Sequence, residues 1–212
     1  MCGIAGFTRF NDPTGDITSL KKMGDKIAHR GPDANGEYLD ESIGLCHRRL
    51  SIIDLSTAGN QPMLSADGNF VIVFNGEIYN FKELRSDLEK KGFQFSTKTD
   101  TEVILALYQL EGKQCVHKLF GMFAIAIWDK VRKELFLARD RIGKKPLYYY
   151  YDQRRFVFGS EIKAILEIDS IPRDIRHDAI YDYFVYQYVP EGKSIFNNID
   201  KVNPGHYITI NK

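Results

Sequence analysis

The sequence lacks the features of several large classes of protein. It has no apolar run near the roughly 18 residues that a membrane-spanning helix needs. Its first seven residues have neither the basic region nor the long apolar region of a secretory signal. The 29 basic residues are balanced by 28 acidic ones, which leaves a net charge of +1. This charge balance predicts neither a nucleic acid nor a membrane as a partner.

Cysteine is scarce, and nucleotide-binding loops are absent. An odd set of three cysteines, Cys2, Cys46 and Cys115, predicts no disulfide framework and no zinc site. The five histidines show no ligand spacing, so we expect no metal. We also expect no cofactor in this chain, because it contains neither GxxxxGK[ST] nor GxGxxG. A reducing, cytoplasmic setting is the expectation for such a chain.

Strand-like segments dominate the 212 residues, which suffice for one large domain. Apolar runs and alternating patterns predict strands at 3–9, 70–74, 121–128, 134–138, 147–151, 155–158 and 205–210. Helical spacing predicts helices at 18–29, 80–91, 101–111, 161–168 and 177–186. Because strands and helices come in blocks, we predict an α+β fold in which two mainly antiparallel sheets pack together with helices outside.

Cys2 is the first candidate for chemistry. Methionine before a small residue is normally removed, which would leave Cys2 with a thiol and a free α-amine. The pKa of an α-amine is about 7.8 and that of a thiol is about 8.5. This amine can therefore be neutral close to pH 7–8 and accept the thiol proton. The thiolate can then attack a carboxamide and release ammonia. A cysteine at position 2 is an accident of sequence in most proteins, so it is weak evidence alone.

The pair Asn75-Gly76 follows the predicted strand 70–74 directly. Asn-Gly commonly forms a turn, and spacing alone favours that interpretation. The pair also places an amide side chain beside a backbone N–H that glycine leaves accessible. Two such donors are what an oxyanion hole needs.

An amino-acid substrate also needs a cation for its carboxylate and an anion for its ammonium. Arg49, predicted at the entry to a strand, can bind a carboxylate through two hydrogen bonds, although a surface arginine is the commoner interpretation. Asp100 lies at the start of the predicted helix 101–111 and can bind an ammonium group or cap that helix. Glu77 is a second candidate acid. Arg30 lies in a predicted turn that could brace the site.

Together, these signals form an ordered set of motifs over residues 1–210. The set resembles the class II glutamine amidotransferases, and within them the N-terminal glutaminase domain of glutamine-hydrolysing asparagine synthetases. The motifs are Met1-Cys2-Gly3-Ile4, Arg30-Gly31-Pro32-Asp33, Arg49-Leu50-Ser51-Ile52, Gln61-Pro62, Phe74-Asn75-Gly76-Glu77-Ile78-Tyr79-Asn80, Asp100-Thr101-Glu102 and the run from Arg139 to Tyr149.

The resemblance implies a four-layer α/β/β/α sandwich of the N-terminal nucleophile hydrolase type. It implies that Cys2 is the nucleophile and that its own α-amine is the base, which requires removal of Met1. The side chain of Asn75 and the N–H of Gly76 would form the oxyanion hole. The reaction implied is hydrolysis of L-glutamine to L-glutamate and ammonia through a thioester.

The resemblance also implies a set of substrate-binding residues. Arg49 would bind the glutamine carboxylate, and Asp100 and Glu77 would lie near its ammonium group. The backbone around Ile52 and Ile53 would line the pocket.

In asparagine synthetases a second domain follows, which uses ATP and magnesium to adenylate aspartate and receives the ammonia. Its Ser-Gly-Gly-x-Asp-Ser motif is absent here, so we expect one domain over 1–212, with 190–212 closing it before a missing synthetase domain. The expected partners are L-glutamine and that domain, and a homodimer is left open. Two alternatives remain. One is a non-catalytic regulatory or assembly module, which the intact set of site residues disfavours. The other is a glutaminase that feeds a different acceptor.

Overall fold

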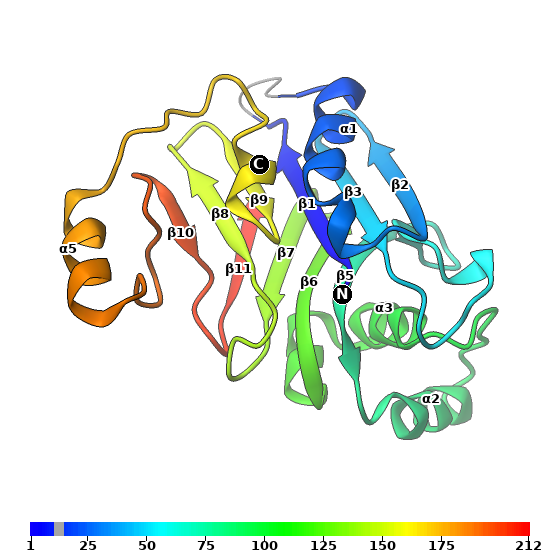
Figure 1. The fold of residues 1–212 in the computed structure, drawn as a ribbon. Helices are drawn as coiled ribbons and strands as arrows, with labels where there is room; N and C mark the ends of the chain where they lie inside the picture. Colours follow the sequence, from blue (N-terminus) through cyan, green and yellow to red (C-terminus); the bar gives the residue numbers. More distant parts are fainter. Residues whose placement is uncertain (11–14) are drawn as a thin grey trace.

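Two antiparallel β-sheets form the centre of the computed structural model, which describes residues 1–10 and 15–212 (Figure 1). The first sheet has six strands in the order β10-β8-β9-β1-β3-β2. Their bounds are β1 (Gly3–Thr8), β2 (Ala34–Leu39), β3 (Ile43–Arg49), β8 (Tyr148–Tyr151), β9 (Phe156–Gly159) and β10 (Ile199–Lys201). The second sheet has five strands in the order β11-β7-β6-β5-β4. Their bounds are β4 (Met63–Leu64), β5 (Phe70–Ile78), β6 (Gly121–Asp129), β7 (Glu134–Arg139) and β11 (Tyr207–Asn211).

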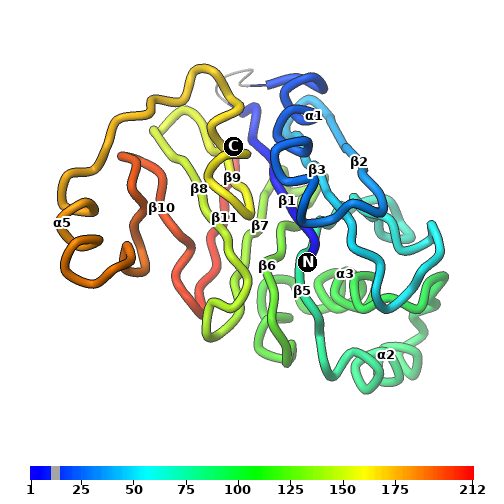
Figure 2. The backbone as a smooth tube through the Cα atoms, in the orientation of Figure 1, coloured from blue at the N-terminus to red at the C-terminus, as the bar shows by residue number. Residues whose placement is uncertain are grey.

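Helices cover the outer face of each sheet (Figures 1 and 2). The six-stranded sheet carries α1 (Ile17–Lys26) and the short α4 (Ile162–Ile165), and the five-stranded sheet carries α2 (Phe81–Lys90) and α3 (Asp100–Glu111). Three short 3₁₀ helices are η1 (Ala28–Arg30), η2 (Thr57–Gly59) and η3 (Gly112–His117). The predicted α+β sandwich of two packed antiparallel sheets with helices outside is confirmed.

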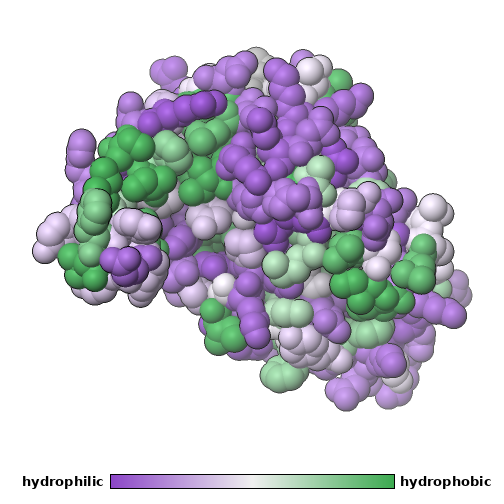
Figure 3. Space-filling view, in the orientation of Figure 1, coloured by the Kyte–Doolittle hydropathy of each residue, from purple (hydrophilic) through white to green (hydrophobic). Residues whose placement is uncertain are grey.

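Helix α5 (His177–Tyr186) lies to one side of the layers (Figures 1 and 2). Ala179 is its one fully buried residue, while Tyr181 and Phe184 are largely exposed. Figure 3 shows hydrophobic residues gathered at the left of the molecule, the side on which Figure 1 places α5. No helix in the described part of the chain is both long and apolar enough to cross a membrane.

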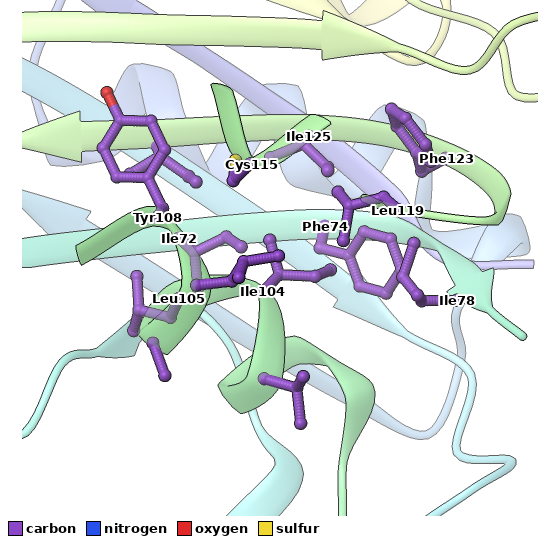
Figure 4. Packing of buried hydrophobic residues seen from close by; sticks show 14 of the residues in the cluster. Ile72, Phe74, Ile78, Ile104, Leu105, Tyr108, Cys115, Leu119, Phe123 and Ile125 are labelled. Atoms are coloured by element: carbon purple, nitrogen blue, oxygen red, sulfur yellow. The ribbon is translucent and has the colours of Figure 1, made fainter. Parts of the chain in front are cut away.

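Alternation along the strands sends side chains to two different cores. In β5, Val71 and Val73 pack between the sheets, whereas Ile72 and Phe74 pack against the helices. This follows from the period of two along a strand. Figure 4 shows Ile72 and Phe74 meeting Ile104 of α3. Strand β5 is therefore buried on both faces, and its inward-facing row continues from Val73 to residue 75.

A capping residue at its N-terminus fixes where α3 begins. Thr99 is the N-cap residue, and its side chain accepts a hydrogen bond from the N–H of Glu102. The helix ends at Gly112, whose φ of +59° lies in the left-handed region that favours glycine. The helix predicted at 101–111 is thus confirmed, with its N-terminus fixed beside the end of β5.

Two predicted helices are shorter than expected. The segment predicted as 18–29 contains α1, which ends at Lys26, followed by η1. The segment predicted as 161–168 contains only the one-turn helix α4. In contrast, the helix predicted at 177–186 has the bounds of α5.

Candidate active site

A pocket of about 170 Å³ opens where β3, β5 and α3 come together beside the start of β1. We call it the Cys2 pocket. All eight site residues predicted from the sequence line it, namely Cys2, Arg49, Ile52, Ile53, Asn75, Gly76, Glu77 and Asp100. The fold therefore brings together residues that are up to 98 positions apart, and their individual roles stay predictions.

The thiol of Cys2 lies at the edge of the pocket, directly before β1. Its Sγ accepts a hydrogen bond from the N–H of Leu50 over 3.4 Å and lies 3.7 Å from the carbonyl oxygen of the same residue. Burial raises the pKa of this half-buried thiol, and the hydrogen bond with Leu50 opposes that rise. The other two thiols, Cys46 and Cys115, are fully buried, and burial raises the pKa of each to about 12. Cys2 is therefore the cysteine that a substrate can reach.

The backbone of Cys2 is clamped from η1. Arg30 donates from Nε to the carbonyl oxygen of Cys2 over 3.0 Å, and its Nη1 forms an ion pair with Glu161 at 2.9 Å. Ser160 Oγ accepts the N–H of Ile4 over 3.0 Å. These contacts fix the first residues of β1 against the start of α4. Arg30 thus braces the site, as its predicted turn suggested.

Asn75 and Gly76 lie within β5 and not in a turn. They pair with Ala124 and Phe123 of β6 in a regular antiparallel register. The prediction of a turn from the Asn-Gly pair is therefore wrong. Nine consecutive residues of β5 pair with β6, and this tertiary pairing overrides the local preference of Asn-Gly.

The register also determines where the N–H of Gly76 points. Its partner Phe123 directs its own N–H and carbonyl to Asp140 on the opposite side of β6. Gly76 and Phe123 are thus a non-hydrogen-bonded pair, and the N–H of Gly76 points away from β6. A Cβ at position 76 would lie 2.2 Å from the carbonyl oxygen of Met122, so only glycine fits this close approach.

On the side of β5 that faces away from β6, three N–H groups on alternate residues point in the same direction. Phe74 donates to Gln61 Oε1 over 2.6 Å, and Ile78 donates to Asp100 Oδ2 over 3.0 Å. Between them, the N–H of Gly76 has no acceptor within residues 1–10 and 15–212. The strand thus offers one unused donor to the Cys2 pocket.

The side chain of Asn75 is also without a partner. It is 1% exposed, and neither its Nδ2 nor its Oδ1 forms a hydrogen bond with the described residues. An unsatisfied buried amide costs about 1–3 kcal/mol, so such groups usually have a functional reason. Asn75 follows Val73 on the face of β5 that looks toward the other sheet, where Cys2 directly precedes β1. Two unused donors therefore lie on adjacent residues of the Cys2 pocket.

Asp100 is the first residue of α3 and is 4% exposed. It does not cap the helix, because Thr99 occupies that position, so the capping interpretation of Asp100 is wrong. Burial raises the pKa of Asp100 to about 6, and the hydrogen bond from Ile78 opposes that rise. A carboxylate with this burial can provide a strong anionic contact for a bound cation.

Arg49 is the last residue of β3, so the prediction that it lies at the entry to a strand is wrong. It is 7% exposed and shares the inward face of β3 with Leu45. Its guanidinium donates to the carbonyl oxygens of Asp54 and Ser56 and to Asn60 Oδ1. These bonds hold segment 50–60 over the pocket. Arg49 and Asp100 both line the pocket, so it contains a buried cation as well as a buried carboxylate.

The remaining predicted residues form the outer wall of the pocket. Ile52 is 71% exposed and Ile53 is 39% exposed, both in the segment that Arg49 holds. Glu77 is exposed on β5, one residue after Gly76. Polar groups therefore line the floor of the pocket, and two isoleucines line its mouth.

Sequence reasoning missed Lys145 and the contacts of Gln61. Lys145 belongs to the short basic run 143–146, which was interpreted only as a turn, yet it is 5% exposed and lines the pocket. Gln61 was noted only as part of a motif, but its Nε2 donates to Thr101 Oγ1 while its Oε1 binds β5. The signal available in the sequence was the place of both residues inside ordered motifs.

Comparison with known proteins gives consistent matches over the whole chain. The family model described as "Glutamine amidotransferase domain" matches residues 1–212. "Asparagine synthetase [glutamine-hydrolyzing] 1" of Bacillus subtilis is 43% identical over 99% of this chain and 33% of its own length. A "putative asparagine synthetase [glutamine-hydrolyzing] 2" of Methanocaldococcus jannaschii is 41% identical over 95% of this chain and 42% of its own. The chain thus spans about a third of the length of the first of these relatives.

A solved structure shares the fold. The glutamine phosphoribosylpyrophosphate amidotransferase of B. subtilis, solved with ADP and GMP, superposes with a TM-score of 0.66 over 82% of this chain and 45% of its own. The two sequences are 20% identical, so this likeness concerns the fold alone.

Proposed function

The chain belongs to the family of glutamine amidotransferase domains, and on that premise we propose that the Cys2 pocket hydrolyses L-glutamine to L-glutamate and ammonia. The observation that carries the proposal is the placement of two unused donors, on Asn75 and Gly76, in the same pocket as an accessible thiol. Neither donor bonds another group within residues 1–10 and 15–212. Both fit an oxyanion that exists only during the reaction.

The reaction begins with the mature chain, in which Met1 has been removed. The α-amine of Cys2 takes the thiol proton, and Sγ forms a bond to the carboxamide carbon of glutamine. The carbonyl oxygen becomes an oxyanion and accepts hydrogen bonds from Asn75 Nδ2 and the N–H of Gly76. The C–N bond then breaks, the ammonium group of Cys2 returns a proton to the leaving nitrogen, and ammonia departs.

Water completes the cycle by attacking the thioester. The α-amine of Cys2 accepts a proton from this water, the C–S bond breaks, and glutamate leaves with the thiol restored. Each step uses the same two donors, because both tetrahedral intermediates place their negative oxygen on the same carbon.

Charged groups that line the pocket orient the substrate in this proposal. Arg49 binds the glutamine carboxylate as a forked donor, and Asp100 and Glu77 bind the ammonium group. The backbone around Ile52 and Ile53 covers the methylene carbons. Burial of Arg49 and Asp100 supports these roles, because a charge contact strengthens where water is excluded.

The names of the relatives suggest a destination for the ammonia. We assign residues 1–212 to one amidotransferase domain, which segment 190–212 closes. This domain would supply ammonia to an ATP-dependent asparagine synthetase domain on the same protein. ATP and magnesium would be bound by that second domain, and no cofactor is assigned to this one. A reducing compartment such as the cytoplasm would keep the thiol of Cys2 free.

One experiment tests processing and activity on the same sample. Intact-mass analysis reports removal of Met1, and an ammonia-release assay with L-glutamine reports turnover of the purified chain. We expect Cys2→Ala to release no ammonia while it keeps the thermal transition of the wild type. Cys115→Ala is the matched control, because it also removes a thiol but from the core. Ammonia release by Cys2→Ala, or none from wild type lacking Met1, would refute the proposed function.

A further inference from the structure

Lys145 is a buried lysine whose backbone is held by hydrogen bonds at both its N–H and its carbonyl group. It lies in the loop between β7 and β8 and is 5% exposed. Its N–H donates to Asp140 Oδ2 over 3.0 Å, and its carbonyl oxygen accepts from Arg139 Nε over 2.8 Å. The same Asp140 carboxylate also accepts the N–H of Lys144. The loop therefore has little freedom to move the Lys145 side chain elsewhere.

The ammonium group of Lys145 points at the first residue of the chain. Its Nζ donates to Met1 Sδ over 3.1 Å, and both residues line the Cys2 pocket. A thioether is a weak acceptor. Among the described residues, no carboxylate lies within ion-pair distance of this Nζ. A buried cation without an anionic partner is costly, so its retention here needs a reason.

Removal of Met1 changes what Lys145 contacts. Met1 is bonded to the nitrogen that becomes the α-amine of Cys2, and its departure takes away the only acceptor of Lys145 Nζ among the described residues. The amine and the thiol of Cys2 then share the pocket with an unpaired ammonium group. A neighbouring positive charge lowers the pKa of an amine, because it disfavours a second cation.

We propose that Lys145 is a positioning residue for catalysis, whose ammonium group keeps the α-amine of mature Cys2 neutral near pH 7 so that it can act as the base. An ordinary lysine titrates about three pH units above neutrality. Burial lowers the pKa of Lys145 from this high starting value, and the proposal requires the group to keep its charge near pH 7. The same charge favours the thiolate form of Cys2. This inference rests on the proposed function, since it assigns a role within that reaction.

Other charged groups face Cys2 and Lys145 from every neighbouring element. The cations besides Lys145 are Arg30 of η1 and Arg49 of β3. Both are engaged in hydrogen bonds, Arg30 with Glu161 and Arg49 with segment 50–60. Burial lowers the pKa of Lys145, and the charge of Arg30 adds to that effect. Within the part of the chain that the structure describes, Lys145 is thus the cation near Cys2 whose charged atom has no oxygen partner.

Three carboxylates face the same groups, and they act in the opposite direction. They are Glu77 of β5, Asp100 of α3 and Asp140 of the β7–β8 loop. Asp140 accepts hydrogen bonds from four backbone N–H groups, and Asp100 accepts one from the N–H of Ile78. A negative charge raises the pKa of the Cys2 amine, so Lys145 is needed to offset these carboxylates.

The test measures the pH profile of kcat for ammonia release at saturating glutamine, where the change of KM expected from Asp100 does not enter, with Met1 removal verified by intact mass. In Lys145→Met we expect the acid limb to move to higher pH by about one unit, because the amine stays protonated longer. The rate of Cys2 alkylation by iodoacetamide should shift in the same direction. Lys145→Arg keeps a positive charge and should restore the wild-type limb. Lys145→Gln is measured beside these variants in case the methionine variant does not fold.

Lys144→Met is the matched control, because it removes one positive charge from the same loop at an exposed residue. Its acid limb should equal that of the wild type. An unchanged limb in Lys145→Met or Lys145→Gln would overturn the inference, as would an equal shift in Lys145→Arg. These results would leave the proposed function intact. Failure of the wild type to release ammonia would instead refute the proposed function itself.

Discussion

The N–H of Ile78 donates a hydrogen bond to Asp100 Oδ2 over 3.0 Å, which joins the last residue of β5 to the first residue of α3. This bond holds a carboxylate that is 4% exposed in the wall of the Cys2 pocket. Because burial outweighs the hydrogen bond, the pKa of Asp100 is raised from 3.8 to about 6. Asp100 therefore changes its charge within the range in which an enzyme can be assayed.

This raised pKa predicts a pH dependence of glutamine binding. Only ionised Asp100 attracts the ammonium group of the substrate, so KM should rise as the pH falls through about 6. Asp100→Asn should raise KM at pH 7.5 by about 10- to 100-fold, the worth of a hydrogen bond to a charged group. It should also remove this acid-side rise. Asp169→Asn, an exposed carboxylate outside the pocket, is the control. An Asp100→Asn enzyme with the wild-type KM at both pH values would contradict the assignment.

The same substitution weakens substrate binding but should stabilise the folded protein above pH 6. The folded state binds the Asp100 proton more tightly than the unfolded state, so the folded protein loses stability as pH rises from about 4 through 6. Asparagine can still accept the N–H of Ile78 but carries no charge. Asp100→Asn should therefore raise Tm at pH 8 by about 3 °C or more and leave Tm nearly unchanged at pH 4. Thermal melts at the two pH values distinguish this effect from a general change in packing.

Arg49 is predicted to serve binding rather than turnover. Its guanidinium contacts the backbone of segment 50–60 and lines the pocket, whereas no reacting atom needs it in the proposed mechanism. Arg49→Ala should raise the KM for glutamine by about 10-fold or more, because a charged hydrogen bond is lost. The kcat at saturating glutamine should fall far less.

Arg48 offers a matched control on the same strand. It is the preceding residue of β3, and its side chain points to the other face, where Nε donates to the carbonyl oxygen of Gly24. Arg48→Ala removes the same charge and volume outside the pocket, so its KM should equal that of the wild type. Equal KM values for Arg48→Ala and Arg49→Ala would show that Arg49 does not bind the substrate.

Periodic segments of the chain were predictable because local and tertiary preferences agree in them. The residues of α5 and the alternating core of β6 follow from spacing alone. The pair Asn75-Gly76 is different, because its local preference is a turn while its pairing with β6 makes it a strand. Only the register with Phe123 shows where the N–H of Gly76 points.

The surroundings of the site residues could not be predicted from the sequence for a similar reason. Lys145 is far from Met1 along the chain, and its position beside Met1 depends on how Asp140 and Arg139 fold the loop between β7 and β8. Likewise, the raised pKa of Asp100 depends on burial by neighbouring elements. Residue identity could be predicted from the motifs, but charge state and donor availability depend on contacts across the fold.

The final prediction concerns Asn75, whose buried amide has no hydrogen-bond partner among the described residues. If it donates to the oxyanion, Asn75→Ala should lower kcat by about 10²- to 10³-fold with little change in KM. Because no existing hydrogen bond is lost, Tm should stay equal or rise. This combination of lower activity and retained stability is what a donor reserved for the reaction predicts.

Asn35→Ala is the control for the loss of an amide, since Asn35 is an exposed residue of the edge strand β2. Its kcat and KM should match the wild type. Asn75→Asp is informative beside Asn75→Ala, because it keeps the shape of the side chain but replaces the donor with a carboxylate that repels an oxyanion. Its kcat should fall at least as far as that of the alanine variant. An Asn75→Ala enzyme with wild-type kcat, measured where Cys2→Ala is inactive, would remove Asn75 from the oxyanion hole and leave Cys2 as the nucleophile.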